Sequence, residues 1–153
     1  METSTTTDAM SYGFDDRNVV WHTLGDFEHL VFAMLDVDED RRIFDALVKF
    51  EAGRQIFLHR HLAHTNTLVI QGEHRLYEPD GSLREVRPVA SHTSSPPDDR
   101  PHREGGGAEG AVVFYSLRAE RDTLFEILDD DLNVVGTLGM QDFIAAYKEQ
   151  KGV

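Results

Sequence analysis

The segment "GRQIFLHRHLAHTNTLVIQG", residues 53–72, places three histidines at positions 59, 61 and 64 of an otherwise strand-like run. In a β-strand, residues i and i+2 point to the same face, so His59 and His61 are predicted to stand side by side. Two neighbouring imidazoles can share one metal ion at about 2.0–2.2 Å per bond. Gln55 and Phe57 have the same parity, and we expect them to face the same interior.

Short strand-like runs separated by turn signals extend outward from this segment. They cover residues 29–37, 42–50, 111–117, 123–129 and 132–138. Asp80-Gly81 is a hairpin signal, because such residues adopt positive φ at low cost. Many short strands at this spacing predict a β-sandwich or a β-barrel.

The end of the chain has a different period. In residues 139–150, "GMQDFIAAYKEQ", the apolar side chains of Phe143, Ile144 and Tyr147 fall on one helical face. The pattern predicts a short C-terminal helix that covers one end of the barrel.

Residues 91–110, "SHTSSPPDDRPHREGGGAEG", are rich in Ser, Pro, Asp and Gly. Strand-like sequence flanks them closely, so we interpret them as a long loop within the domain and not as a linker. Long loops inside compact domains are often functional. This one holds His102, between Pro101 and Arg103.

Composition limits the possible functions. The 153 residues suffice for one domain, and we expect a polar, poorly ordered leader at 1–18 and a single domain at 19–153. The net charge of -13 argues against nucleic acid and anionic membrane as partners. The absence of cysteine excludes disulfides and thiolate metal sites, and it agrees with a cytoplasmic location. No apolar run approaches the roughly 18 residues of a transmembrane helix.

Glycine and proline spacing around the histidines carries a resemblance. Gly53 stands six residues before His59, Gly72 eleven after His61, and Pro97 five before His102. This resembles the two signature motifs of the cupin superfamily. The resemblance implies an all-β, RmlC-like jelly-roll barrel with the short C-terminal helix.

The same resemblance implies a metal at the centre of the barrel, held by His59, His61 and His102. The glutamate of the first cupin motif would fall on Thr65 or Asn66, neither of which is a carboxylate. The implied centre is therefore all-histidine. Three neutral imidazoles would leave the charge of a divalent ion uncompensated.

The last third of the chain is similar to the end of small cupins related to acetylacetone-cleaving dioxygenase and 2,4'-dihydroxyacetophenone dioxygenase. Those proteins bind iron through three histidines. The resemblance implies a non-haem Fe(II) dioxygenase that uses O2 to cleave a C–C bond in a β-diketone or hydroxyketone. It also implies a homodimer or homotetramer. Nitrogen ligands suit Zn(II), Ni(II) and Cu(II) as well.

Two other functions remain open: a non-oxidative lyase or isomerase, and a zinc-binding sensor that is not an enzyme. We expect no catalytic residue beyond the metal ligands, with Phe57 and Asn66 in contact with substrate. His64 lies off the register of the pair, and either faces solvent or joins the site. Only one of Phe114 and Tyr115 can face inward, because neighbouring strand residues alternate.

The other histidines are His22, His29, His74 and His92. Each stands alone, and we interpret them as surface or hydrogen-bonded residues.

Overall fold

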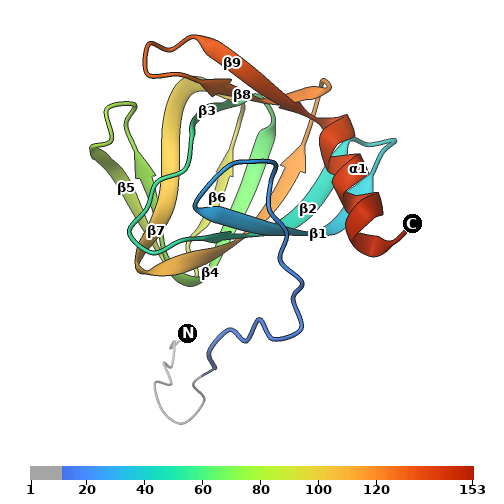
Figure 1. Cartoon of the computed structure of the whole chain (residues 1–153), viewed down its shortest axis with the longest axis horizontal. Coiled ribbons are helices and arrows are strands. Elements are labelled where there is room, and N and C mark those ends of the chain that lie inside the picture. The colour runs from blue at the N-terminus through green and yellow to red at the C-terminus, as the bar shows by residue number, and fades with distance from the viewer. Residues whose placement is uncertain (1–11) are drawn as a thin grey trace, which may run out of the picture.

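The computed structural model describes residues 12–153 of the chain (Figure 1). Within them lie nine strands and one helix: β1 Leu30–Asp38, β2 Ile43–Phe50, β3 Leu58–His61, β4 His64–Tyr77, β5 Leu83–Pro88, β6 His92–Ser95, β7 Asp98–Arg118, β8 Thr123–Leu128, β9 Val134–Gly139 and α1 Met140–Lys151. Residues 1–11 of the expected leader lie outside the described part. The domain boundary at residue 19 stays a prediction.

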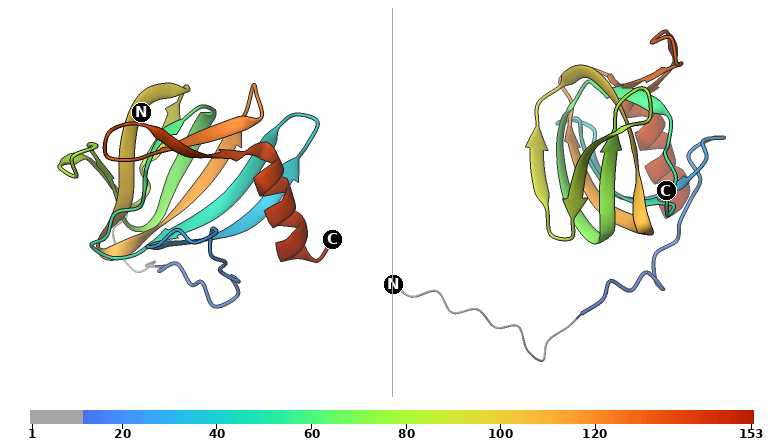
Figure 2. Two further views of the ribbon diagram at one scale, coloured as in Figure 1. Left: turned by 45° about the horizontal axis from the view of Figure 1, so that its top comes forward. Right: turned by 90° about the vertical axis from the view of Figure 1, so that its left-hand side faces the viewer.

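The strands curl into a barrel, seen almost end-on in the right-hand view of Figure 2. All the strand pairings are antiparallel, in the order β1-β2-β7-β3-β8-β9, and β4 pairs with β5, β6 and β7. The predicted all-β jelly roll with a C-terminal helix is confirmed.

The long strand β7 joins the two halves of the barrel. Its second half pairs with β2 and β4, from Ala111 to Arg118. Its first half pairs with β3, and there the register places His59 opposite His102. Two histidines that are 43 positions apart in the sequence thereby become cross-strand neighbours.

Glycines lie where the pairing of β4 with β7 shifts register. Gly72 has φ +74° and Gly110 has φ +80°, a region that L side chains rarely adopt. A Cβ on Gly72 would lie 2.1 Å from the carbonyl oxygen of Gly110. The register of β4 against β7 shifts between Gly72 and His74, and beyond this shift the His74 side chain is fully buried.

The helix α1 closes one end of the barrel (Figures 1 and 2). Asp142 accepts a hydrogen bond from the backbone N–H of Gly139 at 2.7 Å, which satisfies one donor at the helix start. Phe143 and Ile144 are buried as predicted, and Phe143 stacks on Phe44 of β2 with ring centroids 4.4 Å apart. In the described part of the chain, α1 is too short and polar to span a membrane.

The loop predicted for residues 91–110 is wrong. This segment forms β6 and the first half of β7. Proline and glycine weaken strand propensity, but the edges of β4 and β3 supply the backbone partners that the local sequence does not favour. His102 therefore lies on a strand, where alternation fixes the direction of its side chain.

Candidate metal centre

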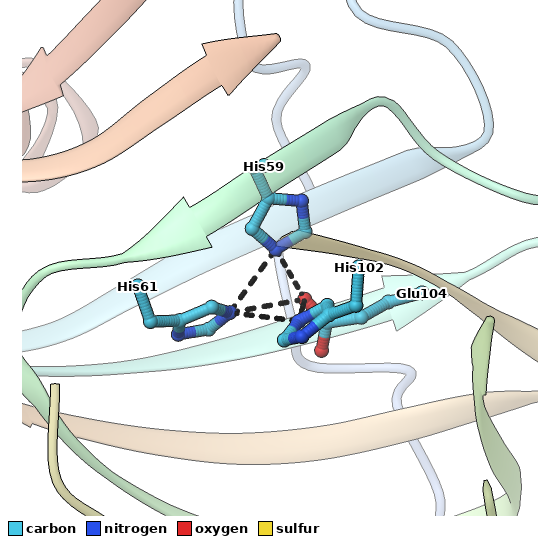
Figure 3. A group of neighbouring side chains, drawn as sticks. All are labelled: His59, His61, His102 and Glu104. Atoms are coloured by element: carbon cyan, nitrogen blue, oxygen red, sulfur yellow. Dashed lines mark hydrogen bonds and ion pairs between the residues drawn. The ribbon is translucent and has the colours of Figure 1, made fainter. Parts of the chain in front are cut away.

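Two strands, β3 and β7, each contribute two ligand-type side chains to one cluster. β3 supplies His59 and His61, and β7 supplies His102 and Glu104, each pair two residues apart and so on one face. Figure 3 shows the four side chains converging from the two strands. One ligand atom from each lies within 4.8 Å of all the others.

The β3 histidines are oriented by groups close to them in sequence. His59 donates through Nδ1 to the carbonyl oxygen of Phe57 at 2.9 Å. Thr65 donates its hydroxyl to the Ala63 carbonyl at 3.1 Å, so its oxygen accepts from Nδ1 of His61 at 3.3 Å. With Nδ1 engaged in these contacts, each ring turns Nε2 toward the centre.

Glu104 is oriented by residues that are distant in sequence. Its Oε1 accepts from the Tyr115 hydroxyl at 2.6 Å and from Nε2 of His74 at 2.8 Å. Phe50 stacks on the His74 ring at a centroid distance of 5.2 Å, and His74 is fully buried. These contacts occupy Oε1 and leave Oε2 facing the histidines, 2.7 Å from Nε2 of His59.

The protonation states suit ligand chemistry. Burial lowers the pKa of His61, and it lowers the pKa of His102 to about 3, although Glu104 opposes both shifts. Burial alone would raise the pKa of Glu104, but hydrogen bonds with the surrounding imidazoles hold it well below its usual value. Burial and the charge of Glu104 raise the pKa of Tyr115, which keeps its proton as a donor. At neutral pH, His61 and His102 are neutral and Glu104 is an anion.

These four residues fit a metal ion. His59 donates from Nδ1 to Phe57 and turns Nε2 toward a carboxylate oxygen 2.7 Å away, a contact that either a proton or a metal cation between the two atoms satisfies. Ligand atoms about 2.1 Å from one ion, at a right angle, lie about 3.0 Å apart. The Nε2 atom of His61 lies 3.0 Å from that of His59 and 3.1 Å from that of His102.

Two cavities adjoin the cluster, and His61, Glu104 and Tyr115 line both. The first, of about 70 Å³, is apolar and includes Phe57 and Phe125 among its lining residues. The second, of about 170 Å³, is polar. Hydroxyl, guanidinium and carboxylate groups surround it, and its lining includes Thr65, Thr67, Thr93, Ser95, Arg84, Arg87, Arg100, Glu85 and Asp98.

The structure brings together His59, His61 and His102, the three ligands that the sequence predicted. Phe57 lies beside them, with its ring centroid 5.1 Å from that of His59. Asn66 is not among the lining residues of either cavity. Strand alternation turns it away from its neighbour Thr65, which does line the polar cavity.

The structure also places the other residues that the sequence singled out. His64 lies outside the cluster, and its Nε2 is 2.8 Å from the Ser94 hydroxyl. Tyr115 is the buried member of the Phe114–Tyr115 pair. Of the lone histidines, His74 is hydrogen-bonded as expected, but its partner belongs to the cluster.

Sequence reasoning missed Glu104, which the structure places in the candidate cluster beside the three histidines. The signal was present, because His102-x-Glu104 has the same spacing as His59-x-His61. It was overlooked because residues 91–110 were assigned to a loop, where i and i+2 need not share a face. Thr65, in the expected glutamate position, instead accepts a hydrogen bond from His61.

Solved structures share this fold, although no family model and no curated protein matches the sequence. An RmlC-like cupin from Ralstonia eutropha JMP134 gives a TM-score of 0.71 at 19% identity, over 88% of this chain and 83% of that one. An acetylacetone dioxygenase from Acinetobacter johnsonii gives a TM-score of 0.62 at 13% identity, over 97% of this chain and 98% of that one. An RmlC-like cupin from Shewanella frigidimarina NCIMB 400 gives a TM-score of 0.52 at 16% identity, over 73% of this chain and 94% of that one.

At these identities the likeness extends to the fold alone. The local geometry adds a cluster of three histidines and one glutamate that could hold a metal ion. The chain thus has the RmlC-like cupin fold, with a candidate metal centre inside its barrel.

Proposed function

We propose that this protein is a metal-dependent cupin enzyme, a non-haem Fe(II) dioxygenase that cleaves a C–C bond in a β-diketone or hydroxyketone. One observation carries the proposal: three imidazole nitrogens and one carboxylate oxygen converge beside an apolar cavity. The fold is also similar to that of an acetylacetone dioxygenase.

His59, His61, His102 and Glu104 would hold the ion. When bound, the metal would supply Lewis acidity toward the substrate oxygens and a redox couple for O2. The hydrogen bonds to Phe57 and Thr65 keep the two β3 rings from rotating. Tyr115 and His74 occupy one oxygen of Glu104, which favours binding of the metal through the other oxygen alone.

Aromatic side chains shield the cluster on its apolar side. The Phe125 ring lies edge-on to His61, with centroids 5.1 Å apart, and Phe57 packs on Phe27 at 4.3 Å. Such a wall excludes water and accommodates the alkyl or aryl arm of a ketone. A dry site also strengthens the electrostatic interactions between the protein and the reacting oxygens.

Glu104 favours a second candidate, a non-oxidative lyase or isomerase. The carboxylate compensates one charge of a divalent ion, so an anionic chelating substrate is less necessary than it is with histidines alone. A Lewis-acid reaction would use the same residues without O2. Consumption of O2 separates the two candidates.

The test begins with protein purified without O2, loaded with Fe(II) and assayed for metal by elemental analysis. An oxygen electrode then records turnover with acetylacetone and with aryl hydroxyketones. We expect O2 uptake in the wild type and in a His64→Ala control, and none in His59→Ala. A fully iron-loaded wild type that consumes no O2 with any of these substrates would reject the dioxygenase for this substrate class.

We also infer a homodimer or homotetramer that works in the cytoplasm without a nucleic-acid or membrane partner. Among the described residues, β5 pairs only with β4, and its Leu83 and Val86 are 55% and 43% exposed. An uncovered strand edge with apolar side chains favours association. Light scattering on the purified protein measures the mass, and a monomer at micromolar concentration would contradict the inference.

A further inference from the structure

The polar cavity beside the cluster contains a cationic group whose hydrogen bonding is incomplete. Its lining includes three arginines, but their surroundings differ. Arg84 donates from Nε and Nη2 to the two carboxylate oxygens of Glu78 at 2.6 and 2.8 Å, and also to the Pro101 carbonyl. Arg100 lies at the rim, with 67% of its side chain exposed. These two are either paired or hydrated.

Arg87 is neither fully paired nor hydrated. Only 14% of its side chain is exposed, and its Nε is one of three buried side-chain atoms in residues 12–153 that have no hydrogen-bond partner. Its Nη2 donates to Glu85 at 3.1 Å, but 46% of that carboxylate side chain is exposed. Its Nη1 makes only a long contact of 3.4 Å with the Thr93 hydroxyl.

Hydroxyl groups accompany this guanidinium. Thr93 contacts Thr67 through their hydroxyls, and both residues line the cavity with Arg87. The same cavity is also lined by His61, His102 and Glu104. A small molecule that fills this space would contact both the cluster and Arg87.

A planar guanidinium with free N–H groups binds a carboxylate through two parallel hydrogen bonds. Hydroxyl donors beside it suit the same ligand. The chain as a whole carries a net charge of -13, so it repels anions except where a cation is placed locally. Arg87 supplies such a cation within the cavity that reaches the cluster.

We propose that Arg87, with Thr67 and Thr93, binds the carboxylate of a carboxylated β-dicarbonyl, a 2,4-dioxo acid, whose keto oxygens face the metal centre. This inference rests on the proposed function for the position of the keto groups. It adds a chemical class of substrate that acetylacetone, a neutral diketone, does not represent.

The test is isothermal titration calorimetry on Zn(II)-loaded protein, with two matched ligands, 2,4-dioxopentanoate and acetylacetone. They differ in a carboxylate at the place of one methyl group. Arg87→Gln should weaken binding of the acid at least about tenfold and change binding of acetylacetone less than about twofold, because only the acid loses its charge-assisted hydrogen bonds. Arg100→Gln, at the rim of the same cavity, should change neither ligand by more than about twofold.

Arg87→Lys keeps the charge but lacks the planar fork, so its loss of affinity for the acid should be intermediate. It also carries the test if Arg87→Gln does not fold. Equal losses for the two ligands in the Arg87 variants would overturn the proposal, as would an equal effect of Arg100→Gln. The zinc-loaded protein needs no O2, so a failed oxygenase assay and a failed carboxylate site give separate results.

Discussion

The two pairs of candidate ligands, one on β3 and one on β7, are held in orientation by different kinds of contact. On β3, His59 and His61 are oriented by Phe57 and Thr65, each within four positions of the histidine it contacts. On β7, Glu104 is oriented by His74 and Tyr115, which are 30 and 11 positions away. His59, His61 and His102 could be named from the sequence, whereas Glu104 required the fold.

This difference shows that the β3 half of the site is preorganised by groups nearby in the sequence and the β7 half by tertiary contacts. On β3, the histidines are held by the Phe57 carbonyl and by one long hydrogen bond to Thr65. The β7 support uses two buried donors on one carboxylate oxygen, enclosed by aromatic rings. We therefore expect substitutions around β7 to alter metal affinity more than equivalent substitutions around β3.

The largest effect should follow removal of a ligand from either pair. His59→Ala, His61→Ala or His102→Ala should each lower Zn(II) or Co(II) affinity by more than about 100-fold, beyond the typical cost of losing a supporting partner. Competition with a chromophoric chelator measures the affinity, and circular dichroism checks folding. His64→Ala is the matched control and should stay within about twofold. Full metal occupancy in His102→Ala would show that His102 of β7 is not a ligand.

Glu104→Gln tests whether the β7 carboxylate is a ligand. Glutamine has nearly the same shape but no charge, so it should lower metal affinity by about 100-fold. Wild-type affinity in this variant would restore the all-histidine centre. The comparison with Glu109→Gln, an exposed position on the same strand, separates loss of the ligand from loss of one negative charge.

Acid should destabilise the metal-free protein, because burial lowers the pKa of His102 on β7 and of His61 on β3. Burial, opposed in part by Glu104, lowers the pKa of His102 from 6.5 to about 3, so between these values the unfolded chain binds a proton that the folded chain does not. The lowered pKa of Glu104 acts in the same direction below its ordinary value of 4.5. At about 1.4 kcal/mol per pKa unit, the shift of His102 alone should lower the free energy of unfolding by about 3 kcal/mol when the pH falls from 6.5 to 4.

Urea unfolding in the presence of a chelator, at pH 7 and pH 4, measures this loss. His102→Gln should show a smaller difference between the two pH values, while His64→Gln should follow the wild type. Equal pH dependence in all three proteins would assign the loss of stability to other groups.

The smallest effect compares the two supports directly. Tyr115→Phe removes a 2.6 Å donor to Glu104 and should lower metal affinity by about tenfold. Thr65→Val removes a 3.3 Å contact with His61 and should lower metal affinity only about threefold. Chelator competition measures both, with Thr137→Val on the exposed part of β9 as control. A larger loss in Thr65→Val would reverse the proposed difference between the strands.

The sequence alone determined the architecture and the β3 half of the centre. Alternation and turn residues are local properties, so β1, β2, β8, β9 and the helix were predicted to within a few positions. The resemblance of the glycine, histidine and proline spacing to the cupin motifs also implied His102. For the strands and the helix, the physical determinant lies within about ten residues of the feature that it predicts.

Only the tertiary structure decided that residues 98–110 are strand and that Glu104 belongs to the β7 half. Residues 91–110 have the composition of a loop, and they become strand because β3 and β4 provide hydrogen-bonding edges. That pairing fixes the parity that turns Glu104 inward with His102, and it brings His74 and Tyr115 to the same carboxylate. A carboxylate of this kind is a ligand only when distant donors and rings surround it, and no short stretch of sequence encodes those contacts.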